Sequence, residues 1–230
     1  MGNPAKALRW GYDCASNVLI MVNSVKIMGF KERQQKHKEE FRAEILKAAV
    51  ALFAEEGYAK FSMRKLAARI GYSPTTIYLY FRDKDDLLLH ICENLYAALL
   101  QEMQELRTLP LPPEQILKAT YLSYIRYNLA NPEQYKVVFF SNPYLYGRPE
   151  DYFARDTMSN RCWRNMCETI DACMQSGYFR PLDRDTLAIV LWSAMHGLVS
   201  SLIFTKDFPM PDPDVMAEML LDGLLNGYRA

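Results

Sequence analysis

Apolar residues recur at three- and four-residue spacing along this chain, which is the period of a helix with one buried face. Ile45, Ala49, Leu52 and Phe53 follow this spacing in a segment expected to be helical from about residue 36 to 56. Gly57 follows directly, and a glycine at this position is typical of a helix end. The same period returns in later segments, so the pattern predicts an all-α protein.

Proline and glycine divide the later segments from one another. Pro110, Pro112 and Pro113 interrupt the chain between two apolar stripes, and Gly177 is expected to cap another helix. The later helices are predicted over residues 84–107, 114–129, 132–140, 149–175 and 183–204, and from the prolines at 209–213 to about 227.

Residues 62–84 predict two short helices joined by a tight turn. Ser62 is expected to cap the first helix, because its hydroxyl can accept from an otherwise unpaired backbone N–H. Gly71 can adopt the positive φ that is needed just past a helix end. The inward side of this first helix is assigned to Met63, Leu66, Ala67 and Ile70.

The second helix is predicted as about eight residues, with Ser73 as its N-cap and Pro74 as its first residue. Ile77 and Phe81 are four residues apart and are expected to anchor it to the core. The face left over is polar and aromatic, as in a recognition helix that enters the major groove of DNA. A plain antiparallel helix pair is the alternative, although such pairs seldom expose two threonines and two tyrosines together. The exposed set is Thr75, Thr76, Tyr78, Leu79 and Tyr80.

Charge is distributed unevenly although the whole chain is neutral. Residues 31–84 hold 12 Lys or Arg against 7 Asp or Glu, a net charge of +5, whereas residues 85–230 hold 12 against 19, a net charge of −7. A basic block that coincides with the two short helices favours contact with phosphate. We therefore divide the chain into a DNA-binding domain over 31–84 and a helical body over 85–230. Residues 1–30 are expected to be a disordered or mis-started extension.

Several motifs between residues 42 and 88 resemble the DNA-binding domain of the tetracycline-repressor (TetR) family of transcriptional regulators. They are Ile45-Leu-Lys-Ala-Ala-Val-Ala-Leu-Phe53, Glu56-Gly-Tyr58, Phe61-Ser-Met-Arg-Lys-Leu-Ala67, Gly71-Tyr-Ser73, Thr76-Ile-Tyr78, Tyr80-Phe81 and Lys84-Asp-Asp-Leu-Leu88. The resemblance implies an all-helical homodimer, most often a repressor, that binds a palindromic operator and is released when a small effector binds the C-terminal domain.

The same resemblance supplies the DNA-binding residues. Arg64 matches a position that reaches a base edge or a phosphate, and Leu79 departs from the polar or aromatic residue expected there. The full set that the resemblance implies is Ser62, Arg64, Lys65, Ser73, Pro74, Thr75, Thr76, Tyr78, Leu79, Tyr80 and Lys84. An architectural DNA-binding protein without an effector remains the alternative.

In the body, Trp192-Ser-Ala-Met-His-Gly197 resembles a Trp-x-x-x-His-Gly signature of one subgroup of this family. Trp192 and His196 lie four residues apart and so share a helix face. They can form part of a pocket or dimer seam, or they can be an ordinary buried pair. The aromatic and methionine residues of the body favour an aromatic or lipophilic effector. The expected pocket residues are Tyr124, Tyr127, Phe139, Phe140, Trp163, Met166, Trp192, Met195 and His196.

Dimerisation is expected through the last two helices, in a two-fold seam. The residues expected in this seam are Leu187, Leu191, Leu198, Leu202, Met219, Leu220 and Leu224. We expect no membrane partner, because no apolar run approaches the ~20 residues of a membrane span. A cytoplasmic location is expected.

The sequence shows no signature of an enzyme, a metal site or a cofactor site. It has neither a nucleophile–base constellation nor a glycine-rich phosphate loop. Its three histidines and five cysteines do not show metal-ligand spacing. Cys162 and Cys167 are therefore expected to be core or pocket thiols.

Overall fold

The structure is a computed structural model, and it describes residues 29–142, 145, 154–205 and 207–230. The expected N-terminal extension, residues 1–30, lies outside the described residues except for its last two. The chain divides into two compact units, residues 1–41 and 42–230. All sites discussed below belong to the second unit. The expected domain boundary after residue 84 stays a prediction.

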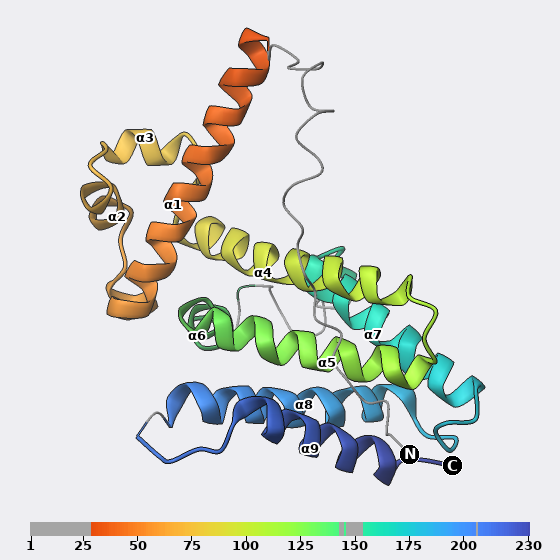
Figure 1. Cartoon of the computed structure of the whole chain (residues 1–230). Coiled ribbons are helices and arrows are strands. Elements are labelled where there is room, and N and C mark those ends of the chain that lie inside the picture. Colours follow the sequence, from red (N-terminus) through yellow and green to blue (C-terminus); the bar gives the residue numbers. More distant parts are fainter. Residues whose placement is uncertain (1–28, 143–144, 146–153, 206) are drawn as a thin grey trace, which may run out of the picture. The chain divides into compact units, whose positions relative to one another are not determined.

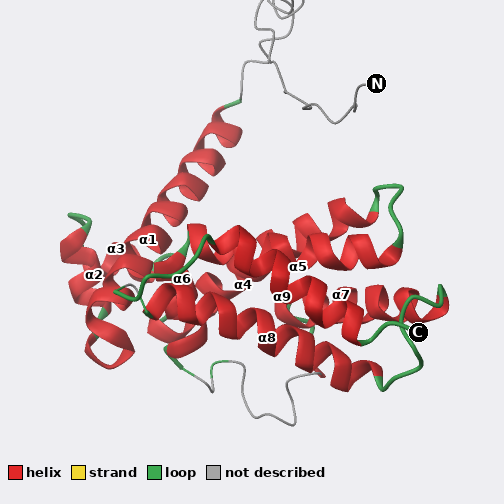
Figure 2. Ribbon diagram, turned by 60° about the horizontal axis from the view of Figure 1, so that its bottom comes forward, coloured by secondary structure: helices red, strands yellow, loops and turns green. Residues whose placement is uncertain are grey.

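The described part of the chain forms nine helices and no β-strand, which confirms the all-α prediction (Figures 1 and 2). The helices are α1 (Phe30–Lys60), α2 (Met63–Arg69), α3 (Pro74–Tyr78), α4 (Lys84–Arg107), α5 (Pro113–Ala130), α6 (Pro132–Phe140), α7 (Met158–Gln175), α8 (Arg184–Phe204) and α9 (Pro213–Gly227).

Two helices are shorter than predicted. α7 begins at Met158 and not near residue 149, because Thr157 is extended and its hydroxyl accepts from the backbone N–H of Asn160 at 3.2 Å. Residues 149–153 of the expected helix lie outside the described residues. α3 has five residues and not eight, because its last turn tightens: the N–H of Tyr80 donates to the carbonyl of Ile77 at 2.9 Å.

Three glycines stand where the sequence predicts the end of a helix or a turn. Gly57, Gly71 and Gly177 have φ values of +74°, +74° and +77°, a region that residues with a Cβ seldom adopt. Gly57 interrupts the helical geometry inside α1, which agrees with the expected end of the first helix.

The head of the second unit consists of the last part of α1 with α2 and α3. Phe53 and Phe61 stack with their ring centroids 3.9 Å apart, and Ile77 and Phe81 are buried, as the sequence predicts. α4 starts beside this head, where Asp83 caps it by accepting from the N–H of Asp86 at 2.8 Å. The pKa of Asp83 is lowered by this hydrogen bond. α4 then continues for 24 residues into the body.

The body is a bundle around α5, which contacts α4, α6, α7, α8 and α9. α8 and α9 run side by side along it (Figure 1). Ion pairs hold α5 to α9, because Lys118 lies 2.5 Å from Glu218 and 2.6 Å from Asp222. The two acids raise the pKa of Lys118. Contrary to the expectation that no apolar run approaches the length of a membrane span, the 21 residues of α8 are long and apolar enough for one by length and composition alone. Core helices of soluble proteins have the same length and composition, so this is weak evidence for a membrane.

Candidate nucleic-acid interface and ligand cavity

Serine hydroxyls begin both helices of the α2–α3 pair. Ser62 accepts from the N–H of Lys65 at 3.3 Å, and Ser73 accepts from the N–H of Thr76 at 3.2 Å. Pro74 is the first residue of α3, where its missing N–H has no helical partner to lose. Met63, Leu66 and Ala67 are buried, so the inward side of α2 is as predicted except that Ile70 is only half-buried.

The outward side of α3 presents large side chains to solvent. Leu79 is 76% exposed and Tyr78 is 52% exposed, whereas Ile77 between α3 and the core is fully buried. Thr75 is exposed, and Pro74, Thr76 and Tyr80 are half-buried. The Thr76 hydroxyl lies 2.9 Å from that of Ser73. A five-residue helix therefore offers one continuous polar and aromatic face.

The basic residues of this region differ in how far they are already paired within the protein. Arg64 is exposed at the start of α2. Lys65 Nζ lies 2.6 Å from Glu56 Oε2 and donates to the carbonyl of Lys60 at 3.1 Å. The structure thus places Lys65 in a bridge from α2 to the end of α1.

Lys84 lies in a cluster that the sequence did not predict. Its Nζ is 3.9 Å from the centroid of the Tyr58 ring and donates to the Tyr58 carbonyl at 3.4 Å. The Tyr58 hydroxyl donates to Asp85, and burial together with this carboxylate raises the pKa of Tyr58 to about 12. These contacts fasten the end of α1 to the start of α4. Tyr58 and Asp85 fall within motifs that resemble the family, but the sequence did not show that they would meet Lys84.

A cavity of about 400 Å³ lies between α4, α5, α7 and α8 in the body. Its lining is aromatic and aliphatic, with a few hydroxyl groups and one thiol. The lining residues are Tyr96, Leu99, Met103, Thr120, Tyr121, Ser123, Tyr124, Ser159, Cys162, Trp163, Met166, Ile189 and Trp192. The sequence did not predict the α4 residues of this lining, Tyr96, Leu99 and Met103. Their helical spacing is that of any helix with one buried face, so it does not distinguish a cavity from a packed core.

Four of the nine expected pocket residues line this cavity: Tyr124, Trp163, Met166 and Trp192. The structure places the other five elsewhere. Met195 is fully buried in the core, and Phe140 is 56% exposed. Tyr127 lines a separate surface groove, and Phe139 and His196 lie in an aromatic cluster next to the cavity. Helical spacing alone does not tell which neighbour an inward side chain meets.

His196 joins this cluster to the cavity wall. Its ring stacks on Trp192 with centroids 4.8 Å apart, as the four-residue spacing predicts. Its Nδ1 lies 3.2 Å from the Tyr124 hydroxyl and 3.1 Å from the Tyr135 hydroxyl. Burial lowers the pKa of His196, so the imidazole is neutral at pH 7.

The two cysteines expected to be core or pocket thiols are placed accordingly. Cys162 lines the cavity and its thiol donates to the Tyr96 carbonyl at 3.2 Å. Burial raises the pKa of Cys162 to about 12 and that of the buried Cys167 to about 11. Thiolates are the reactive form of cysteine, and these sites disfavour them.

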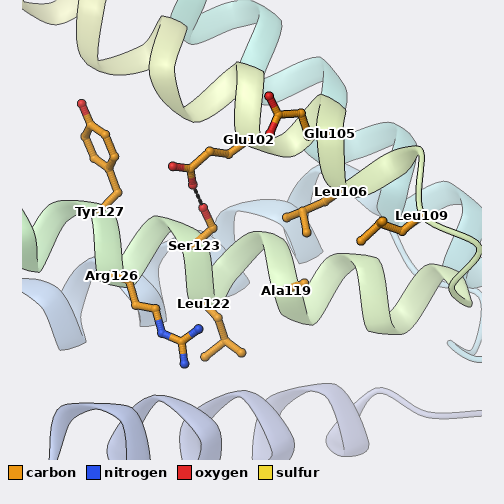
Figure 3. A pocket seen from close by; sticks show the side chains of 9 residues that line it. All are labelled: Glu102, Glu105, Leu106, Leu109, Ala119, Leu122, Ser123, Arg126 and Tyr127. Carbon is orange, nitrogen blue, oxygen red and sulfur yellow. Dashed lines mark hydrogen bonds between the residues drawn. The ribbon is translucent and has the colours of Figure 1, made fainter. Parts of the chain in front are cut away.

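A groove of about 630 Å³ lies on the outer side of the α4–α5 pair (Figure 3). Ser123 on α5 donates a hydrogen bond to Glu102 on α4, and both residues line this groove. Ser123 also lines the 400 Å³ cavity, so this contact stands between the two spaces. Arg126 points away from Glu102, toward α9, where it pairs with Asp214 at 3.0 Å (Figure 3).

The outer face of α8 and α9 carries large apolar side chains among polar and small ones. Five large side chains are each between 39% and 72% exposed: Ile189, which also lines the cavity, Val190, Phe204, Val215 and Met219. Of the residues expected in the dimer seam, Met219 lies on this face, but Leu187, Leu191 and Leu198 are buried inside the subunit. That part of the prediction was wrong because α8 is apolar on all sides, so periodicity does not identify its outer face.

Comparison with known proteins gives two family matches. Residues 45–91 match the family described as bacterial regulatory proteins, tetR family, and residues 117–224 match a tetracyclin repressor-like C-terminal domain. Together they span about two thirds of the chain.

The relatives found are regulators as well. The HTH-type transcriptional regulator HbdR of Aromatoleum sp. (strain CIB) is 27% identical over 188 residues, which cover 81% of this chain and 79% of HbdR. The fatty acid degradation regulator FadR of Bacillus halodurans has a similar structure, with a TM-score of 0.69, 19% identity, and coverage of 80% of this chain and 94% of FadR. PfmR of Thermus thermophilus gives a TM-score of 0.65 and 22% identity, covering 79% of this chain and 96% of PfmR. At these identities the two solved structures establish the fold alone.

Proposed function

Because the chain belongs to the TetR family of bacterial regulatory proteins, we propose that it is a dimeric repressor that a small aromatic or lipophilic effector releases from a palindromic operator. The family consists of transcriptional regulators, so the chain is a DNA-binding regulator and not an enzyme. Repression, dimerisation and effector release are the parts that we propose.

The observation that carries the proposal is the exposed face of α3. The buried side chains of Ile77 and Phe81 anchor this segment, and Tyr78 and Leu79 at the end of α3 face solvent, where a partner can contact them. Placed in a major groove, the tyrosine and threonine hydroxyls can contact phosphates and base edges, and Leu79 can contact a thymine methyl group.

Three residues are assigned to the phosphate backbone and one to the bases. Thr76, Tyr78 and Lys84 are proposed to contact phosphate and so to fix the register of the head. Arg64 is exposed, and its guanidinium can pair with a guanine in bidentate fashion. Lys65 is proposed to contribute less, because its ion pair with Glu56 must open first.

The second copy of the chain is proposed to cover the outer face of α8 and α9. Large apolar side chains that gather on one surface mark an interaction site. A two-fold axis would bring this face against its own copy, so that two heads approach one operator from the same side. Two recognition helices then need a separation of roughly 34–36 Å, one turn of DNA, or a multiple of it.

The effector is proposed to occupy the 400 Å³ cavity and to act through α4. This helix supplies part of the cavity wall and begins at Lys84, in the cluster with Tyr58 and Asp85. A ligand that shifts α4 would change the spacing of the two heads and weaken the operator complex. A coupling free energy of about 1–3 kcal/mol is sufficient for a useful switch.

The test is binding of the purified protein to the intergenic DNA upstream of its own gene across a salt series. We expect saturable binding, a protected palindrome and a steep salt dependence. Arg64→Ala and Lys84→Ala should each reduce the salt slope by about one. Arg107→Ala, the same charge change at the far end of α4, is the matched control and should leave the slope unchanged. Weak binding that is indifferent to sequence would instead support an architectural role.

A further inference from the structure

We propose that the cavity between α4, α5, α7 and α8 takes uncharged ligands and rejects organic anions such as carboxylates, sulfonates and phosphates. The inference rests on the proposed function in treating this cavity as the effector site, and it adds the chemical class of the effector. The inference is drawn from the residues that line the cavity and from four possible sources of a compensating positive charge. These are His196, the N-terminus of α7, Arg126 and the arginines of the α4–α7 pair.

The lining itself offers no counter-charge. Among the described residues that form the cavity wall, all are apolar, aromatic, hydroxyl-bearing or thiol-bearing. An anion that leaves water for such a site loses its hydration and gains no opposite charge, which is a large cost. Hydroxyl groups can orient a carbonyl or a hydroxyl of a neutral ligand at much lower cost.

His196 is a basic group in contact with the wall, because it bonds to the Tyr124 hydroxyl and stacks on Trp192. It is enclosed by Tyr135, Phe139 and Phe140 on its other sides. In this aromatic enclosure the imidazole stays neutral, as its lowered pKa indicates. It therefore supplies a hydrogen-bonding group but not a positive charge.

The N-terminus of α7 is the second possible source, because Ser159 in its first turn lines the cavity. A helix N-terminus favours an anion through its free N–H groups. Here the protein supplies that anion itself: the N–H of Met158 donates to Glu93 Oε2 at 2.9 Å. Thr157 accepts from the N–H of Asn160. A ligand anion would meet the carboxylate of Glu93 at this end.

The α4–α5 side adds a second acid. Glu102 accepts from Ser123, whose side chain also faces the cavity, so a carboxylate lies directly behind the wall. Figure 3 shows that the arginine of this groove, Arg126, points to α9 and not to Glu102. Partial burial and the neighbouring Glu105 raise the pKa of Glu102 above its usual value.

The arginines of the α4–α7 pair lie on the opposite side of these helices. Arg107, Arg161 and Arg164 line a separate surface depression with Leu100 and Gln104. Arg161 and Arg164 pair with Asp156, and Arg107 pairs with Glu168 at 2.5 Å. None of the three lines the cavity, so their charges face solvent and not a ligand.

Two fluorescent probes with the same arylamine body separate the classes. N-phenyl-1-naphthylamine is uncharged, and 8-anilino-1-naphthalenesulfonate carries one sulfonate. Each is titrated into the full chain without DNA, and binding is followed by probe fluorescence. We expect the uncharged probe to bind at least about tenfold more tightly, because the sulfonate loses hydration without compensation.

Matched variants show whether the electrostatics of the cavity cause this preference. Glu102→Gln keeps the shape of the wall and removes the acid that bonds to the lining residue Ser123. It should reduce the affinity ratio of the uncharged to the sulfonate probe at least about threefold, with little change in the affinity for the uncharged probe. Glu105→Gln is the control, because it removes a charge from the same groove without bonding to Ser123. Equal effects of the two variants would overturn the role of Glu102.

Leu99→Phe fills the cavity with apolar volume and should weaken both probes. If this variant does not fold, Ile189→Trp at the half-exposed rim replaces it. The proposal would be refuted if the sulfonate probe bound as tightly as the uncharged probe and if the cavity-filling variant weakened that sulfonate binding. Binding of neither probe would refute it too, while operator binding would still stand. If the protein failed to bind an operator but still preferred the uncharged probe, only the repressor function would be refuted.

Discussion

Truncation of Ile77 tests whether α3 is held to the head by one side chain. Ile77 is the only buried residue within the five residues of α3, and it is fully buried. Ile77→Ala removes three buried carbon atoms, worth roughly 0.8 kcal/mol each in transfer free energy. The cavity left behind adds to this cost, so we expect the free energy of unfolding to fall by about 3–4 kcal/mol. Ile77→Val removes one carbon and should cost about 0.5–1.5 kcal/mol.

Two measurements on the same samples separate stability from DNA binding. Urea unfolding followed by circular dichroism, at one protein concentration, gives the free energy of unfolding. Operator titration, well below the unfolding midpoint, gives the affinity. We expect Ile77→Ala to lose more than about tenfold in operator affinity and Ile77→Val to lose less than about threefold. An alanine variant within about 1 kcal/mol of the parent would refute the anchoring argument, and an unchanged operator affinity would refute the assignment of α3 to DNA.

Three further predictions follow from the body of the protein. Tyr135→Phe should lower the free energy of unfolding by about 1–3 kcal/mol, because it removes the hydroxyl that bonds to His196. Tyr121→Phe should lower it by less than about 1 kcal/mol, because the hydroxyl of Tyr121 bonds to a methionine sulfur, a weak acceptor. Chemical unfolding of both variants checks this, and equal losses would contradict it. Burial lowers the pKa of His196 below its usual 6.5, so the unfolded chain takes up a proton that the folded chain excludes. The free energy of unfolding should therefore fall as the pH drops below about 6.5. His196→Asn should remove the part of this pH dependence that His196 causes. Met219→Glu should raise the dimer dissociation constant more than about tenfold in sedimentation velocity, since Met219 is 72% exposed on the apolar face, and an unchanged dimer would place the seam elsewhere.

The local signals in the sequence predicted the order of the helices and most of their ends. The serine caps at Ser62 and Ser73, the positive φ of Gly71 and the helix ends at Gly57 and Gly177 were all predicted, because each depends on a few adjacent residues. The start of α7 was misplaced, because the cap at Thr157 is only one of several polar residues that precede it. The inward residues of α2 and α3 were predicted because these helices are polar on one side.

Residue contacts across the fold were beyond the reach of periodicity. Lys65 was assigned to DNA from the sequence, yet in the structure it pairs with Glu56, nine residues earlier. The carboxylates of Glu93 and Glu102 carried no signal, although they set the charge around the cavity. Such pairings depend on which helices become neighbours, and a single-helix pattern contains no information on that.

The sequence by itself determined the family, the helical content and the face of α3 that is exposed to solvent. Only the tertiary structure decided which side of α8 is outside, so that Ile189 is exposed and Leu187 is buried two residues away. It also decided that Trp192 lines the cavity while Met195 does not. The physical reason is that hydrophobic burial has no direction: an apolar side chain is stabilised against any apolar neighbour, and the packing of several helices together selects which neighbour it meets.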